Sequence, residues 1–176
     1  HSAGVHVTNL TPDAPTHATD DVLVVHATQV NIGSTLSTAT SGWTKVTQNS
    51  HSNDMTHAVF YKAAASSSEA MPQIDSTNSE AMTATVYVLD NIDTGDILET
   101  SGVGNSSGSR QSAATMTPTN ADTFCMHFGM SDKDYREIAF LPPVTGIASY
   151  NDDNETTVGA SWFFHQPATT ATTQHY

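Results

Sequence analysis

The chain has 176 residues, enough for one domain with a substantial hydrophobic core. Its formal net charge is −13 and only five residues are basic, so we expect neither a nucleic-acid partner nor binding to an anionic membrane. Charged residues make up only 13% of the chain, unlike the charge-dense composition of a disordered protein. An acidic surface with few lysines keeps a protein soluble in salt, which is consistent with a saline habitat.

Residues 1–20 are predicted to form an N-terminal arm and linker. Polarity alternates from Val5 to Thr8, which is typical of an edge strand or of an extended arm. Pro12 and Pro15 follow, in a segment that offers little for packing. Such an arm can add a strand to a neighbouring subunit, and a frayed terminus is the alternative.

The next part of the chain contains three short apolar segments that are rich in β-branched or aromatic residues and bounded by polar turns. They are residues 22–32, 43–48 and 55–65, and each is predicted to be a β-strand. Residues 22–25 are continuously apolar, which suits a strand buried on both faces. The second segment alternates, so that Lys45 should share a face with Thr47, and Val46 with Gln48.

Residues 66–80 are rich in Ser, Asn and Asp and are predicted to be a loop, followed by a central strand over residues 81–90. Further strand signals lie at residues 97–100, 111–117, 123–130, 135–140, 145–150 and 156–165. The best helix candidate, residues 63–71, is short and Ser-rich. We therefore predict an all-β fold: a single antiparallel, jelly-roll-like β-sandwich over residues 21–166, with a C-terminal tail over residues 167–176.

The pattern of the first three segments returns in the second half of the chain. Residues 122–127 repeat the pattern of 21–26, residues 135–138 that of 43–46, and residues 160–164 that of 58–62. We interpret this as two strand sets of similar build within one domain. The alternative is chance similarity, because amphipathic strands are repetitive by nature.

The histidines and the cysteine do not indicate a metal or redox site. Nine histidines are present, but none has the spacing of a structural zinc site. His26 and His127 occupy equivalent positions in the repeated segments, and we predict polar strand ends there rather than a shared metal site. Cys125 is the only cysteine, so an intrachain disulfide is excluded and a buried, inert thiol is expected.

Other motifs are also weak. Residues 151–155 and 90–93 are rich in oxygen ligands but lack the glycine and spacing of an EF-hand, so we predict solvated turns rather than calcium sites. Residues 102–108 are one residue too long for the dinucleotide-binding glycine pattern, and no GxSxG sequence occurs. We predict no catalytic, cofactor-binding or metal-binding residues, and hence no enzyme.

Most aromatic side chains lie within predicted strands and are expected in the core. Tyr61 and Phe163 are the positions that could instead form an exposed platform for a sugar. Glycosylation sequons begin at Asn9, Asn105 and Asn154, but such matches arise by chance in a chain rich in Ser and Thr.

The succession of segments resembles a domain met in bacteriophage virion proteins. The matching segments are residues 21–25, 42–46, 58–63, 85–89, 122–128 and 159–163, and the resemblance covers about residues 20–166. It implies a jelly-roll-like β-sandwich used in capsid decorations, fibres, tail appendages and adhesins, without catalytic residues. The chain departs from that pattern in its acidity and in the histidines at positions 26 and 127.

From these observations we predict a virion structural protein, namely a capsid decoration, fibre or tail appendage subunit at the virion surface. We expect it to form a homo-oligomer, as such domains often form trimers, and to contact other virion proteins through the arm and the tail. A glycan-binding or host-attachment module is one alternative. A bacterial extracellular surface or fibre subunit is another.

Overall fold

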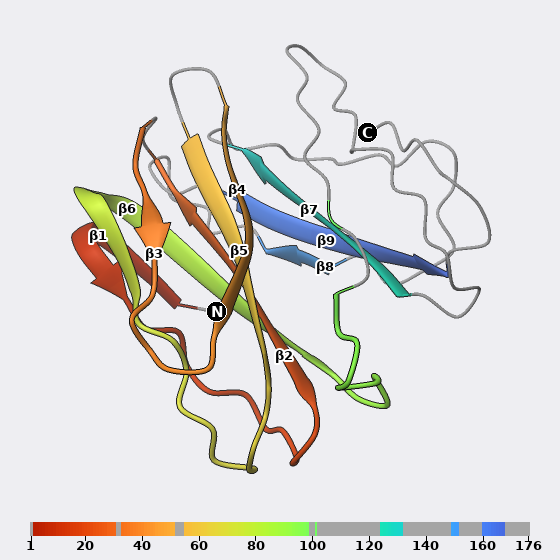
Figure 1. Ribbon diagram of the computed structural model, residues 1–176. Coiled ribbons are helices and arrows are strands. Elements are labelled where there is room, and N and C mark those ends of the chain that lie inside the picture. The colour runs from red at the N-terminus through yellow and green to blue at the C-terminus, as the bar shows by residue number, and fades with distance from the viewer. Residues whose placement is uncertain are drawn as a thin grey trace.

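The computed structural model describes residues 2–30, 33–51, 55–98, 101, 124–131, 149–151 and 160–167. These residues form nine β-strands and no helix, arranged in two antiparallel sheets (Figure 1). The strands are β1 (Ser2–Leu10), β2 (Val22–Gln29), β3 (Leu36–Ser37), β4 (Thr44–His51), β5 (Met55–Ala63), β6 (Ile74–Leu89), β7 (Phe124–Ser131), β8 (Ser149–Asn151) and β9 (Ala160–Pro167). The predicted all-β class is confirmed, and none of the described segments is a helix that could span a membrane.

The larger sheet has six strands and is organised around β2. Its order is β1-β6-β2-β5-β4, and β3 pairs with β6 beside this path. Val24 of β2 lies between Tyr61 of β5 and Tyr87 of β6. Every residue of β2 is buried, so the prediction of a strand covered on both faces is confirmed.

β6 is sixteen residues long and serves two parts of the sheet. Its second half pairs with β2, whereas its first half pairs with the end of β1 and with β3. The prediction of a loop over residues 66–80 is therefore wrong for residues 74–80. The sequence hides this part of the strand because Ile74 is its only buried residue, while the side chains of Ser76 and Asn78 make hydrogen bonds.

The six-stranded sheet curls over one face of β2, so that strands of the same sheet cover this face. The main core on this side consists of Val25, Ala27, Leu36, Ala58, Phe60, Ile74, Met82 and Ala84. A smaller cluster of Leu23, Ala64 and Met71 extends it towards the loop between β5 and β6. Trp43 packs against both clusters, so its predicted place in the core is confirmed.

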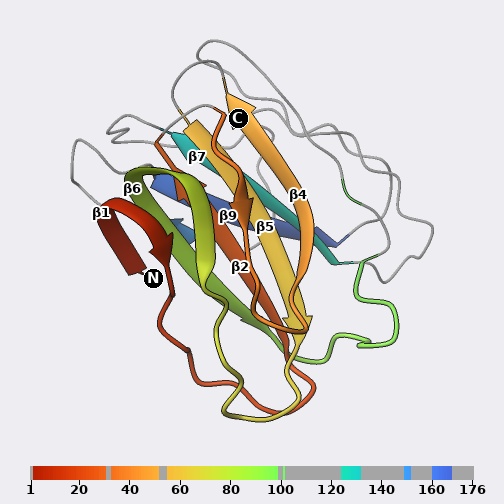
Figure 2. The ribbon, with the colours of Figure 1, turned by 60° about the vertical axis from the view of Figure 1, so that its left-hand side comes forward.

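The opposite face of β2 meets the second sheet, whose strand order is β7-β9-β8. In Figures 1 and 2, β7 and β9 lie behind β2 and β5. Met126 and Phe128 of β7 pack against the buried cluster of Val22, Val24 and Val59. The two sheets thus share an apolar contact.

The repeated segments have equivalent partners in the two sheets. β2 pairs antiparallel with β5, and β7 pairs antiparallel with β9, but in a different register: His26 lies opposite Val59, whereas the equivalent His127 lies opposite Phe164. The first and third members of each repeat are therefore neighbours in space. The middle member of the second repeat, residues 135–138, lies outside the described residues, as does the predicted strand at 111–117. Of the tail predicted over residues 167–176, only Pro167 is described, and it ends β9.

At the N-terminus, the structure has an edge strand rather than an extended arm, because β1 pairs with β6 of its own chain. The pairing is irregular: His6 has a φ of 51°, and the register shifts on both sides of Val7. Irregularity of this kind discourages pairing with a further strand. Residues 11–20 run beside the β5–β6 loop, where the Asp20 N–H donates to the Ala64 carbonyl at 2.8 Å.

The predicted faces of β4 are wrong beyond Lys45, because the strand contains a β-bulge. The register with β5 shifts between Lys45 and Thr47. The extra residue places Val46 against the cluster that faces the second sheet, while Lys45 and Gln48 come together and bond at 2.7 Å. A bulge inserts one residue into the alternation, and simple alternation cannot anticipate it.

Candidate functional site

The contact between the two sheets contains a row of buried polar side chains. Alternation along β2 places His26 and Thr28 on the same face as Val22 and Val24. Thr28 bonds to Thr83 of β6, with 2.7 Å between the hydroxyl oxygens. The polar row is thus continuous with the apolar cluster on which the second sheet rests.

His26 and His57 form a bonded pair within this row. His26 Nε2 lies 2.9 Å from His57 Nδ1, and the rings meet edge to face with their centroids 5.2 Å apart. On the other side, the Phe128 ring of β7 lies 5.0 Å from the His26 ring. The prediction of a polar strand end at His26 is wrong, because His26 lies within β2 and is fully buried.

Both rings are held neutral by their surroundings. Burial lowers the pKa of His57 to about 4. Burial, and secondarily the neighbouring His57, lowers the pKa of His26 well below its usual value. At neutral pH, one ring therefore donates its N–H to the unprotonated nitrogen of the other.

The orientation of this hydrogen bond follows from the second nitrogen of His26. His26 Nδ1 is buried and has no hydrogen-bond partner among the described residues. A buried N–H without an acceptor is rarer in proteins than a buried acceptor without a donor. We therefore assign the proton to Nε2, so that His26 donates to His57 and keeps a bare lone pair at Nδ1.

The described residues do not assemble a metal centre around this pair, since they contain no group of three or more His, Cys, Asp or Glu side chains. Structural zinc sites use four such ligands. His127 lies in β7 opposite Phe164 of β9, and its side chain is outside the described residues. The structure therefore does not test a shared metal site of His127 and His26.

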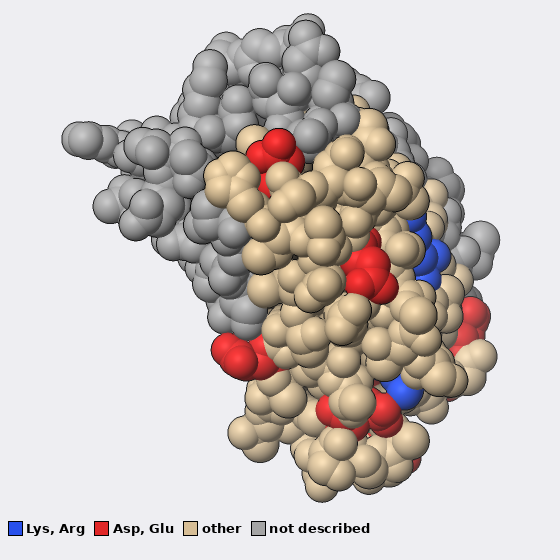
Figure 3. Space-filling view, turned by 90° about the vertical axis from the view of Figure 1, so that its left-hand side faces the viewer, with Lys and Arg blue, Asp and Glu red and all other residues tan. Residues whose placement is uncertain are grey.

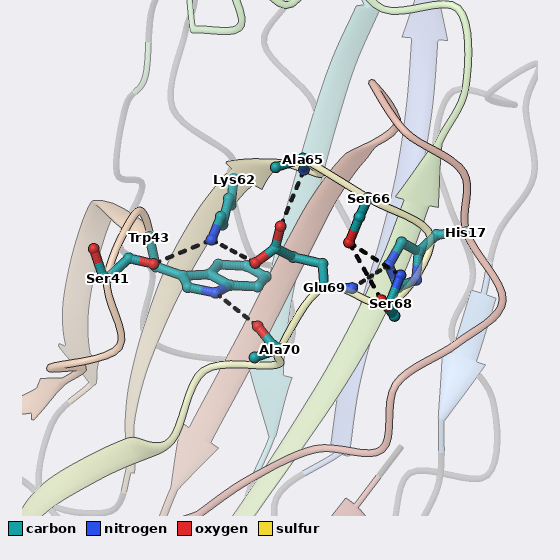
Figure 4. A network of polar contacts seen from close by, with 9 residues as sticks. All are labelled: His17, Ser41, Trp43, Lys62, Ala65, Ser66, Ser68, Glu69 and Ala70. Carbon is teal, nitrogen blue, oxygen red and sulfur yellow. Dashed lines mark hydrogen bonds and ion pairs between the residues drawn. The ribbon is translucent and has the colours of Figure 1, made fainter.

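A second polar network fixes the loop between β5 and β6 (Figure 4). Lys62 Nζ lies 2.6 Å from Glu69 Oε1 and donates to the Ser41 carbonyl at 3.1 Å. The other carboxylate oxygen of Glu69 accepts from the Ala65 N–H at 3.0 Å. The hydrogen bond from Lys62, together with that from Ala65, lowers the pKa of Glu69.

His17 joins this network from the N-terminal segment. Its Nε2 accepts the Glu69 N–H at 3.1 Å, so Nδ1 carries the proton and donates to the Pro15 carbonyl at 2.7 Å. Nearby, Trp43 Nε1 donates to the Ala70 carbonyl at 3.3 Å. These bonds hold residues 11–20 and 64–73 together at one end of the sheet, which is a structural use of the groups.

A third network lies inside the curl of the larger sheet. Buried Gln29 donates to the Asn78 carbonyl at 2.9 Å and accepts from the Ser76 hydroxyl at 2.5 Å. Lys45 Nζ donates to the Leu36 carbonyl at 2.7 Å, and desolvation lowers its pKa. These polar groups join β3 and the first half of β6 to β2 and β4.

The remaining candidate residues are dispersed. Within residues 90–93, Asp93 Oδ1 accepts the Gly95 N–H at 2.8 Å and so closes a turn. Tyr61 packs against the cluster at the sheet contact, whereas the side chains of Phe163 and Cys125 lie outside the described residues. Of residues 151–155 only Asn151 is described, and residues 102–108 are not.

Acidic groups are scattered over the described surface. Figure 3 shows separate red areas and little blue on the face that carries the β1 edge. Of the two described lysines, Lys62 pairs with Glu69, and Lys45 bonds to uncharged oxygens. Within the described residues, the surface charge is therefore negative and mostly unpaired with lysine.

Comparisons of the chain with protein families, curated proteins and solved structures found no match. The resemblance to virion domains accordingly depends on the sequence segments alone.

Proposed function

We propose that this chain is a virion structural subunit, a capsid decoration, fibre or tail appendage protein built as a jelly-roll-like β-sandwich. The observation that carries the proposal is the apolar contact between the two antiparallel sheets. Met126 and Phe128 approach Val22, Val24 and Val59, as side chains from the two inner faces of a sandwich do. The resemblance of the segments to phage virion domains supplies the biological setting.

The use of polar side chains also supports a scaffolding role. Hydrolysis or group transfer needs a nucleophile and a base that a substrate can reach. The polar groups that this fold brings together instead bond to one another across strands: His26 to His57, Thr28 to Thr83, and Gln29 to Ser76. They fix strand positions, which suits a protein whose task is to keep its shape on a particle.

The proposal includes assembly into a homo-oligomer at the virion surface. It is tested by the mass of the purified protein in light scattering, followed by electron microscopy of the same sample. A trimer or a larger closed ring supports the assembly role. The proposal would be contradicted if the protein stays monomeric at all concentrations and also does not bind purified virions.

A glycan-binding module on the same fold remains the rival proposal. It requires exposed aromatic side chains, and Tyr61 is instead packed at the sheet contact. A glycan array separates the two proposals, since specific binding would favour the rival.

A further inference from the structure

The His26–His57 pair occupies the contact between the sheets, where it places two titratable rings in addition to fixing the positions of β2 and β5. The hydrogen bond joins residues 31 positions apart, from β2 and β5. Phe128 of β7 covers the His26 ring, and the Tyr87 ring lies 5.7 Å from that of Phe128. The second sheet thus rests directly on a titratable group.

We propose that this pair is an acid-sensitive latch that holds the three-stranded sheet on the six-stranded sheet. With both rings neutral, one N–H···N bond joins them, and Phe128 of β7 can cover the His26 ring. A proton taken up by the fully buried His26, or by the half-buried His57 bonded to it, leaves a positive charge at the sheet contact, which is costly unless it is paired or hydrated. Hydration of the His26 ring requires water to reach it, and therefore requires Phe128 of β7 to move away from β2.

Among the described residues, the groups that face the pair offer no compensating charge. β6 contributes Thr83, Thr85 and Tyr87, and β7 contributes Met126 and Phe128. On the remaining side, Asn49 of β4 lies opposite His57. No carboxylate among the described residues makes an ion pair with either ring.

The two described lysines lie on the other face of the sheet. Lys62 is opposite Leu23, and Lys45 is opposite Phe60, which both belong to the core inside the curl. The titratable groups that the described residues add on this face are the phenols of Tyr61 and Tyr87, which lie on either side of Val24.

The sign of the effect follows from proton linkage. The pKa of His57 is about 4 in the closed state and returns to about 6.5 once the ring is hydrated. The open state therefore binds more protons, and the latch weakens as pH falls from about 6.5 to about 4. At about pH 5, His57 alone favours the open state about 30-fold more than at about pH 8, and His26 adds to this.

Hydrogen exchange of the full chain tests the latch directly, with protection measured at about pH 8 and about pH 5 and corrected for intrinsic rates. We expect the amides of β7 and β9 to lose protection at the lower pH, while those of β2 and β6 remain protected. Unchanged protection in β7 and β9 would overturn the proposal. So would simultaneous loss in all four strands, since that is global unfolding.

A matched pair of variants assigns the effect to the His57 ring. His57→Gln removes the titrating group, and the share of the pH effect due to His57, about 30-fold, should disappear. His6→Gln is the control, because His6 is 75% exposed on the β1 edge and should leave the pH profile unchanged. A His57→Gln protein that opens with acid as the natural chain does would refute the latch.

The natural chain provides a test that does not depend on the variant folding. Nuclear magnetic resonance of the imidazole nitrogens follows each ring through the acid range. We expect His57 to titrate near 4 in the closed state, and His26 to show a protonated Nε2 and a bare Nδ1 at neutral pH. A His57 ring that titrates at its ordinary value of about 6.5 would contradict the proposal.

Discussion

At the scale of single residues, Gly42 shows how closely the backbone approaches the Lys62–Glu69 pair. Its φ is +85°, and a Cβ atom there would lie 2.9 Å from Lys62 Cε and Nζ. Lys62 cannot retreat freely, because its ammonium bonds to Glu69 and to the Ser41 carbonyl. The glycine therefore serves both the turn and the ion pair.

Gly42→Ala should lower the free energy of unfolding more than Gly33→Ala does. Gly33 has a similar φ of +77° but nothing within 4 Å of its added Cβ, so it reports the cost of the backbone conformation alone. That cost is about 1–2 kcal/mol, and the displacement of Lys62 should add about 1 kcal/mol. Urea unfolding of both variants measures the difference, and equal losses would show that Lys62 adjusts without cost.

Glu69 accepts hydrogen bonds with both carboxylate oxygens, from Lys62 Nζ and from the Ala65 N–H. Glu69→Gln should lower the free energy of unfolding by about 1.5–3 kcal/mol, because an amide NH₂ would face one of these two donors. Glu80→Gln is the control: Glu80 is 39% exposed beside His6, and its loss should cost less than about 0.5 kcal/mol. Similar losses in the two variants would mean that the Lys62–Glu69 pair contributes little.

The histidine pair marks the limit of what the sequence could predict at this scale. Alternation along β5 puts His57 on the face of Val59 and Tyr61. It could not show that His26 is its partner, because that contact depends on the register between β2 and β5 and on the cover provided by β7. The available signal was a histidine in the middle of an apolar strand, which we interpreted as a strand end.

At the scale of elements, apolar strands were predictable and polar strands were not. β2 and the second half of β6 were recognisable because they are rich in apolar and β-branched residues. The first half of β6 has the composition of a loop, and is held in the sheet by Gln29 and by pairing with β1 and β3. Tertiary hydrogen bonds of this kind leave no periodic signal in the sequence.

Gln29 should therefore control the first half of β6. Gln29→Met keeps the approximate volume but leaves the Ser76 hydroxyl and the Asn78 carbonyl without this partner, at a cost of about 1–3 kcal/mol in the free energy of unfolding. Hydrogen exchange should rise over residues 74–80 more than over residues 82–89. Gln73→Met, at an exposed site, is the control. A uniform rise along β6 would argue against a local role for Gln29.

At the scale of the whole molecule, the main feature is the excess of acidic side chains. The chain has eighteen acidic residues and only five basic ones. Of the two described lysines, only Lys62 forms an ion pair with a carboxylate. Like charges on one surface repel and favour the unfolded chain, and repulsion between subunits would equally oppose the proposed oligomer. Dissolved salt should therefore increase both the stability of the folded chain and the assembly of subunits.

Raising sodium chloride from about 0.1 M to about 1 M should stabilise the protein, because the screening length falls from about 10 Å to about 3 Å. We expect the midpoint of thermal unfolding to rise by about 5 °C, which corresponds to roughly 1–2 kcal/mol for a chain of this size. Sucrose at equal osmolality is the control, since it strengthens burial without screening charge. If the unfolding midpoint rises with sucrose but not with salt, repulsion between acidic side chains does not limit the stability of the fold. A rise with salt that also shifts the mass in light scattering towards oligomers would link the charge to assembly.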